Sequence, residues 1–278
     1  MNGSGGGDRA TPKAPGGDKG GGGDITRSLE LLWGTAERPT RGPKRGLTLE
    51  RIVTAAVEVA DAEGLEAVSM RRLSAELGVG TMSLYRYVPG KAELLDLMLD
   101  HLQTPPPDAP RPADGDWRAA VELMARAELA LLRRHPWLLK VNEARTVLGP
   151  GTLRSFEASL RGLRGMGLSD PETISVVISV HAFVSGIARL EADTAAAVRE
   201  SGMAIDQFWK RQEPFLVQAM ESGEFPTMAG LSEDSFSYEF DHFEFGLAAL
   251  LRGVEAQVAA RDRQSTGGED RQAAPKRS

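Results

Sequence analysis

The stretch LGVGTMSLYRYVPGKAELL, residues 77–95, decides the fold class of this chain. A short helical pattern ends at Gly78, and a second one, the candidate recognition helix, follows at residues 81–88. Pro89-Gly90 separates it from a longer helical pattern. Apolar residues at helical spacing can form a small core for the two short helices: Leu73, Leu77, Val79, Leu84 and Val88. Two short helices that cross at a tight turn make a helix-turn-helix unit.

Polar side chains remain on the outer face of the second short helix and next to it. Hydroxyl, guanidinium and ammonium groups can donate hydrogen bonds to the phosphate oxygens and base edges of DNA. On this ground the candidate DNA contacts are Thr81, Ser83, Tyr85, Arg86, Tyr87 and Lys91. By composition alone, such a helix is more often a solvated face than a DNA-binding one.

The flanking sequence continues the all-α pattern. Thr48 can cap a helix that ends at Gly64, and Ser69 can cap the first helix of the helix-turn-helix unit. Further helices are expected at about 91–103, 116–134, 152–165, 171–194, 202–222 and 234–259, with a less regular piece near 136–147. A capping box at Ser169 and Glu172 opens the long apolar helix. Gly186 and Gly246 lie in the two most apolar helices, where they permit close packing.

These patterns predict an all-α protein with a three-helix helix-turn-helix domain at 47–103 and a second α-helical domain at 116–260, whose long apolar helices are candidates for a subunit interface. The glycine-rich leader at 1–24 and the tail at 261–278 are expected to be disordered. Residues 25–46 predict a short helix followed by a basic arm. The arm carries Arg41, Lys44 and Arg45, and it is equally well read as a phosphate-tracking segment or as a solvated linker.

Charge is distributed unevenly along the 278 residues, although the net charge is −6. Residues 25–91 contain ten Lys and Arg against eight Asp and Glu, whereas residues 92–260 contain fifteen against twenty-five. A basic N-terminal module on an acidic body suits an anionic partner at one end. The start of the chain has no apolar signal core, and no long uninterrupted apolar run follows, so we expect a cytoplasmic protein without a membrane partner.

The motifs of common enzymes are missing from the sequence. The chain has no cysteine, which excludes disulfides, thiolate nucleophiles and cysteine-ligated zinc, and it has no P-loop, nucleophile elbow, dinucleotide-binding glycine motif or HExxH. The four histidines are scattered at 101, 135, 181 and 242. We therefore expect no catalytic residue, no cofactor and no metal, and we interpret His181 as an interface or core histidine.

The run at 47–102, and above all residues 77–95, resembles the DNA-binding domain of the TetR family of bacterial transcriptional regulators. The segments HPWLLKV and FEFGLAALLRGVEAQV are more loosely similar to the C-terminal domain of its tetracycline-repressor branch. The resemblance implies a DNA-binding domain at 47–103 and a ligand-binding and dimerisation domain at 116–260. It also implies a homodimer that binds a palindromic operator, usually represses, and is released by a small-molecule inducer. The helix at about 91–103 would then be the lever between the two domains.

The same resemblance assigns roles to individual positions. It makes Arg71 a base-reading residue and Lys91 a phosphate-binding one, and it places Gly80 where the tetracycline repressor has a glutamine. Met82 replaces a proline, and Thr81, Ser83, Tyr85, Arg86 and Tyr87 take the remaining contact positions. The stretch VNEARTVLGPG contains Glu143 but no histidine, which argues against a magnesium-bound tetracycline as inducer.

Ligand-pocket candidates combine aromatic walls with a few polar groups. They are Trp137, Asn142, Arg145, Phe183, Arg189 and Trp209, each of which has an ordinary core or surface role as its alternative. One function from another class stays open at this point. It is a dimeric α-helical ligand-binding or protein-interaction module in which the helix-turn-helix is structural and binds no DNA.

Overall fold

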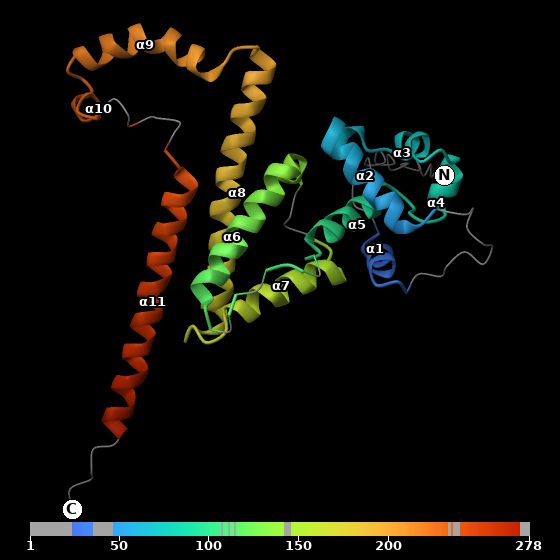
Figure 1. The fold of residues 1–278 in the computed structure, drawn as a ribbon, viewed down its shortest axis with the longest axis horizontal. Coiled ribbons are helices and arrows are strands. Elements are labelled where there is room, and N and C mark those ends of the chain that lie inside the picture. The colour runs from blue at the N-terminus through green and yellow to red at the C-terminus, as the bar shows by residue number, and fades with distance from the viewer. Residues whose placement is uncertain are drawn as a thin grey trace, which may run out of the picture.

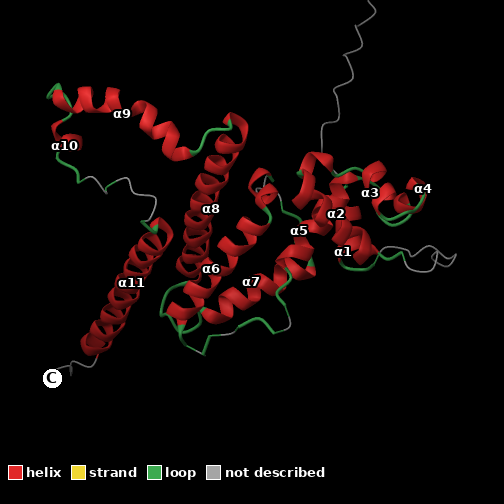
Figure 2. Ribbon diagram, turned by 45° about the horizontal axis from the view of Figure 1, so that its top comes forward, coloured by secondary structure: helices red, strands yellow, loops and turns green. Residues whose placement is uncertain are grey.

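The computed structural model describes residues 24–35, 47–106, 108–110, 112–113, 115–141, 146–232, 235 and 240–272, with side chains up to residue 263. All regular elements in these ranges are helices, which confirms the predicted all-α class (Figure 2). The short helices gather at one end of the molecule as a head, and the long helices form a body at the other end (Figure 1). The glycine-rich leader up to residue 23, the basic arm, Asn142, Glu143 and Arg145 lie outside the described residues.

The head begins with α1 (Ile25–Leu32) and α2 (Leu49–Glu63), followed by the short 3₁₀ helix η1 (Leu65–Ala67). It continues with α3 (Met70–Glu76), α4 (Thr81–Tyr85) and α5 (Lys91–Gln103). The predicted caps are confirmed, because the Thr48 and Ser69 side chains accept hydrogen bonds from the backbone N–H groups of Arg51 and Arg72. Gly78 turns the chain between α3 and α4 at a φ of 64°, a conformation that favours glycine.

The predicted core of the helix-turn-helix unit is present. Leu73, Leu84 and Val88 are completely buried, while Leu77 and Val79 are partly buried and pack against them. Ile52 of α2 and Leu94 of α5 complete this core. The apolar contacts of three helices therefore hold α4 in place, which a five-residue helix could not achieve by itself.

The body contains α6 (Trp117–Arg134), the 3₁₀ helix η2 (Pro136–Lys140), α7 (Pro150–Gly162) and α8 (Asp170–Ser201). It ends with α9 (Ile205–Glu221), α10 (Pro226–Ala229) and α11 (His242–Gln272). The capping box of Ser169 and Glu172 is confirmed at the start of α8. The long helices α6 and α8 lie side by side, and α7 crosses their lower end toward α5 (Figures 1 and 2).

Several helix ends differ from the prediction. The helix α8 continues seven residues beyond 194 through an alanine-rich stretch and ends at Ser201, where Gly202 takes a left-handed conformation. The helix α11 begins later than 234, because Asp241 accepts the Glu244 N–H and caps it there. It then extends to Gln272, so the first part of the expected disordered tail is helical, since each added residue gains a hydrogen bond on an existing helix.

The last helices are only loosely attached to the rest of one chain. The helix α11 contacts α8 and α6, and the Phe183 and Phe243 rings stack there with their centroids 5.8 Å apart. The ring of Phe183 lies against Gly246, which confirms close packing at this glycine, whereas a Cβ on Gly186 would meet no atom of the described residues within 4 Å. The arm formed by α9 and α10 extends away from the α6–α8 layer, and none of its residues is buried (Figure 1).

Candidate nucleic-acid interface and ligand-binding region

The helix α4 presents two large side chains to the outside of the head. Met82 is 76% exposed and Tyr85 is 44% exposed, whereas Leu84 between them is fully buried in the core. The Thr81 hydroxyl donates a hydrogen bond of 3.2 Å to the Ser74 hydroxyl, which fastens the start of α4 to α3. The exposed face of α4 is thus held rigidly by its buried face, an arrangement suited to contact with a DNA groove.

Arg71 and Arg72 are adjacent in sequence but have different roles. Arg72 is a structural residue that the sequence analysis did not single out: it binds Glu63 of α2 and Glu76 of its own helix, each at 2.7 Å. Its hydrogen bonds lower the pKa of Glu63, and those carboxylates raise the pKa of Arg72. Arg71 is exposed and makes no ion pair among the described residues, so its guanidinium is available for an anionic partner.

Gly80, the position at which the family resemblance predicts a changed base contact, is the residue before α4. Its backbone is ordinary and extended, with φ −71° and ψ 141°, and a Cβ there would lie 3.9 Å from the nearest atom, the Ser83 hydroxyl oxygen. The fold therefore has room for a larger side chain at this position. The glycine is not required by the turn, and its effect is to leave the start of α4 bare.

Two candidate contacts are engaged inside the head. The Tyr87 hydroxyl donates to the Leu47 carbonyl at 3.1 Å, and its ring is half-buried beyond the end of α4. The Lys91 ammonium donates to the Leu65 carbonyl at 3.2 Å, although the side chain is exposed. The sequence placed Tyr87 on the recognition helix, but α4 ends at Tyr85, so Tyr87 instead links this region to the start of α2. Arg86 is exposed, and Ser83 is half-buried.

Two family descriptions match the chain. Residues 52–98 match the bacterial regulatory proteins of the tetR family, and residues 109–258 match the tetracyclin repressor-like C-terminal domain. The chain therefore belongs to the TetR family, and it is a DNA-binding transcriptional regulator. This result favours the regulator over the alternative of an interaction module without DNA binding.

Individual relatives agree with this assignment. The chain is 56% identical over 241 residues to the HTH-type transcriptional repressor DrrR1 of Streptomyces coeruleorubidus. This alignment covers 87% of this chain and 89% of DrrR1. It is 28% identical over 218 residues to the class E tetracycline repressor protein of Escherichia coli, covering 76% of this chain and 92% of that one. The fold is similar to the crystal structure of the Streptomyces coelicolor TetR family protein ActR in complex with actinorhodin, with a TM-score of 0.64. The two chains are 31% identical, and the match covers 77% of this chain and 97% of ActR.

The four pocket candidates inside the described ranges do not gather around one cavity. Trp137 is only 4% exposed, and its indole N–H donates to Asp61 of α2 at 2.8 Å. Phe183 stacks on Phe243, and the Arg189 guanidinium donates to the Leu139 carbonyl at 2.9 Å. Trp209 lies on the exposed arm beside Phe208. Within one chain, these side chains have packing and capping roles.

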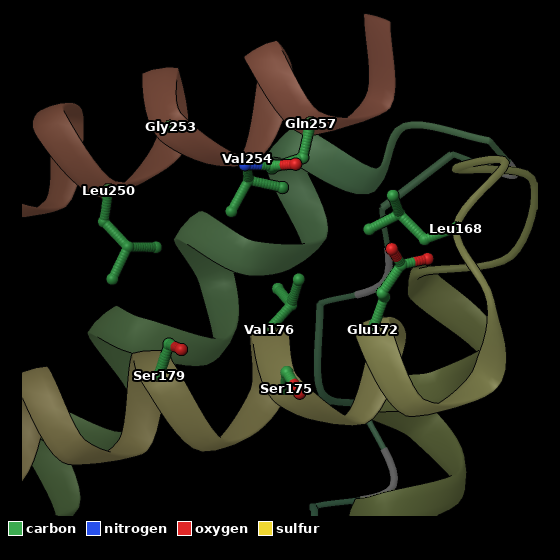
Figure 3. Close-up of a pocket in the computed structure, with 9 residues that line it drawn as sticks. All are labelled: Leu168, Glu172, Ser175, Val176, Ser179, Leu250, Gly253, Val254 and Gln257. Atoms are coloured by element: carbon green, nitrogen blue, oxygen red, sulfur yellow. The ribbon is translucent and has the colours of Figure 1, made fainter. Parts of the chain in front are cut away.

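The hollows that the structure does show lie elsewhere in the body. One, of about 360 Å³, is an open groove between the first half of α8 and the facing side of α11 (Figure 3). Its lining is Leu168, Glu172, Ser175, Val176, Ser179, Leu250, Gly253, Val254 and Gln257. A second hollow surrounds the turn between α7 and α8. Ser175 and Ser179, four residues apart on α8, face Gly253 on α11, and their small size leaves the groove open; no motif in the sequence marked it.

The charged and imidazole groups of the body form ion pairs, and Arg118 of α6 binds both Glu122 of its own helix and Glu255 of α11. Hydrogen bonds from Arg261 and Ser169 lower the pKa of Glu172 to about 2, so this carboxylate in the groove is charged at neutral pH. His181 of α8 lies 2.5 Å from Glu128 of α6 and is partly exposed, so it links two helices and is not a core residue. No three His, Asp or Glu side chains in the described ranges lie close enough together to hold a metal ion.

Proposed function

We propose that this regulator is a repressor that binds a palindromic operator as a homodimer and is released by a small organic molecule. The DNA-binding head is residues 47–103, and the ligand-binding and dimerisation body is residues 116–260. The observation that carries the proposal is the exposed face of α4, with Met82 and Tyr85 projecting from a rigid head. Beside it lies the exposed Arg71, which has no ion-pair partner in the part of the chain that the structure describes. As a regulator of DNA, the protein would act in the cytoplasm.

The proposed contacts divide into two groups by chemistry. Arg71, Thr81, Met82, Ser83, Tyr85 and Arg86 would face base edges, where Met82 can contact a thymine methyl group. Lys91 and Tyr87 would face phosphates, and each would exchange its carbonyl partner in the head for a phosphate oxygen. Gly80 would contribute close approach of the backbone and no side-chain contact, so the operator sequence would differ from that of a relative with glutamine here.

The homodimer is supported by apolar surface that one chain leaves uncovered. The helix α8 is long and apolar enough to cross a membrane, yet only 22% of that apolar window is buried in one chain. Ile178 and Leu190 on α8 are 60% and 64% exposed. A DNA-binding regulator needs this surface covered by protein, and a second copy with the same surface covers it symmetrically.

The inducer proposal rests on the body and on its relatives. One relative of known structure is bound to actinorhodin, and another is named a tetracycline repressor, so we propose that this body also binds a small organic molecule. The absence of histidine from residues 141–151 supports an inducer that binds without magnesium. Because Phe183, Arg189 and Trp209 do not share a cavity in one chain, the pocket would be completed on dimerisation.

The test is selection of bound sites from a random duplex library with the full chain at moderate salt. We expect enrichment of a palindromic site of roughly 15–20 base pairs, with an affinity that falls steeply as salt increases. Arg71→Ala and Tyr85→Ala should each weaken binding to that site about tenfold or more. Arg154→Ala, an exposed arginine on α7, is the matched control and should leave affinity unchanged. No enriched site, or equal effects of Arg71→Ala and Arg154→Ala, would refute the proposal.

A further inference from the structure

Two carboxylates of the head bind groups of the body, at separate places and from different helices. They are Asp61 of α2 and Asp100 of α5. We infer that both are positioning residues, which set the orientation of the head on the body and through it the fit of the dimer to its operator. This inference rests on the proposed function for its operator-binding consequence, while the head–body contact itself can be measured without DNA.

Asp61 binds the corner where α6 ends and η2 begins. One of its oxygens lies 2.7 Å from His135 Nδ1 and 2.8 Å from Trp137 Nε1. A carboxylate only accepts hydrogen bonds, so the geometry places the His135 proton on Nδ1. Both rings are almost completely buried, whereas the Asp61 side chain is 31% exposed. Trp137 is therefore a contact between head and body, which explains its burial without a ligand pocket.

Asp100 takes the place of the missing cap at the start of α7. The residue before that helix, Gly149, has no side chain to cap it. Asp100 accepts instead from the Gly151 N–H at 3.0 Å, the Thr152 N–H at 2.8 Å and the Thr152 hydroxyl at 2.9 Å. A carboxylate is stabilised by the free N–H groups and the positive end of a helix. A helix of the head thus supplies the N-terminal cap of a helix of the body.

The residues around Pro150 are adapted to this approach. A Cβ on Gly149 would collide with the Asp100 carboxylate, and a Cβ on Gly151 would collide with the Asp100 carbonyl and the Thr104 hydroxyl. Both glycines have ordinary negative φ angles or are helical, so they are needed for space and not for an unusual backbone conformation. The segment Gly149-Pro150-Gly151-Thr152 therefore provides a start of α7 that only a closely packed carboxylate can complete.

Two separate attachments constrain the head more than one could. The start of α7 is bound by Asp100 and, beside it, by the Trp33 indole N–H, which donates to the Leu148 carbonyl at 3.3 Å. With these adjacent contacts alone, the head could pivot about the start of α7. The second contact, from Asp61 to His135 and Trp137, removes that rotation. A displacement of α7 or of the end of α6 would then move the head as a rigid unit, and the spacing of two heads in a dimer determines whether both reach the operator.

The two carboxylates respond differently to the same conservative change, which gives the inference a sharp test. Asparagine at 61 retains an oxygen for both ring N–H groups. At 100 it does not suffice, because N–H donors face both carboxylate oxygens and an amide would point its own N–H₂ at one of them. Asp61→Asn should therefore be tolerated, and Asp61→Ala and Asp100→Asn should each release one attachment.

The first measurement is the distance between head and body. Since the chain has no cysteine, Ala75→Cys on α3 and Arg154→Cys on α7 introduce two unique sites for spin labels. Labelled chains are diluted in excess unlabelled protein, so that the measured distance lies within one chain. We expect a narrow distance distribution for the doubly labelled parent and for Asp61→Asn, and a distribution at least twice as broad for Asp61→Ala and Asp100→Asn.

The second measurement is affinity for the selected operator and for random duplex DNA. Asp61→Ala and Asp100→Asn should weaken operator binding at least tenfold and leave binding to random DNA unchanged, because the DNA-contacting side chains are intact. The control is Asp116→Ala, which removes the cap of α6 inside the body and lowers stability without touching the head. Distance distributions and operator affinities that match this control would overturn the inference. If the parent binds no operator, the proposed function fails, and the distance measurement still decides whether the carboxylates position the head.

Discussion

At the residue scale, Asp96 on α5 is a carboxyl group whose charged form the head disfavours. The Ser28 hydroxyl of α1 donates to it at 2.5 Å, but partial burial and the nearby Glu93 carboxylate both disfavour its charge. Burial is the larger cause, and the pKa of Asp96 is raised above its ordinary value of 3.8. Asp96 is therefore held in place by α1 at a cost in stability whenever it is ionised.

Replacing Asp96 by asparagine should remove this cost. A carboxyl whose pKa is raised by folding stabilises the fold relatively more at low pH and less as the pH rises through that pKa. Asp96→Asn should therefore raise the melting temperature at pH 7, and its advantage should shrink as the pH falls toward 4. Thermal unfolding between pH 4 and 8 measures this difference, with the exposed Glu66→Gln as control. An advantage that does not depend on pH would contradict the assignment.

At the element scale, the packing of α11 on α8 depends on the absence of a side chain at one position. A Cβ on Gly246 would enter the Phe183 ring, whereas a Cβ on Gly186 meets nothing within 4 Å in one chain. Both glycines lie inside long helices, so both replacements by alanine gain the same helix propensity, about 1 kcal/mol. The pair separates the effect of packing from the effect of propensity.

Gly246→Ala should lower stability, because overpacking costs about 1–3 kcal/mol and outweighs the gain in propensity. In the monomer, obtained with Ile178→Glu and Leu190→Glu because these residues share the exposed face of α8 with Gly186, Gly186→Ala should raise stability by up to about 1 kcal/mol. Urea unfolding of both variants at equal protein concentration measures the two free energies. If the two variants changed stability by the same amount in the same direction, close packing at Gly246 would not be the reason for glycine there.

At the scale of the whole molecule, α8, α9 and α11 carry apolar side chains that one chain leaves exposed. The arm formed by α9 and α10 has five exposed apolar residues, Phe208, Trp209, Phe215, Leu216 and Val217, and the start of α11 exposes Phe245. Apolar side chains this numerous on the last third of the chain are expected between subunits and not in water. A second copy would cover them and close the groove between α8 and α11.

We expect the full chain to sediment as a dimer at micromolar concentration. The double variant Ile178→Glu, Leu190→Glu should shift it toward monomer and weaken operator binding at least tenfold, because two linked heads bind far better than one. Phe156→Glu, on an exposed part of α7, is the control and should remain dimeric. Sedimentation equilibrium measures both, and a double variant that stays dimeric would place the interface on another surface.

Local sequence signals predicted the elements because their physical causes are local. Thr48, Ser69 and the Ser169–Glu172 pair cap helices through bonds to residues three positions away, so their effect is visible in the sequence. Helix ends were less accurate where propensity continued past the expected limit, as at the end of α8. The end of α4 was also missed, so Tyr87 was placed on the recognition helix.

The sequence by itself determined the all-α class, the helix-turn-helix unit, and the exposure of residues such as Met82 and Tyr85, because helical periodicity separates a buried face from an exposed one. Only the tertiary structure decided that the Trp137 indole N–H donates to Asp61, that Asp100 caps α7, and that Phe183 fills the space beside Gly246. These contacts join residues far apart in the chain. Their partners are selected by the packing of whole helices, which no local pattern specifies.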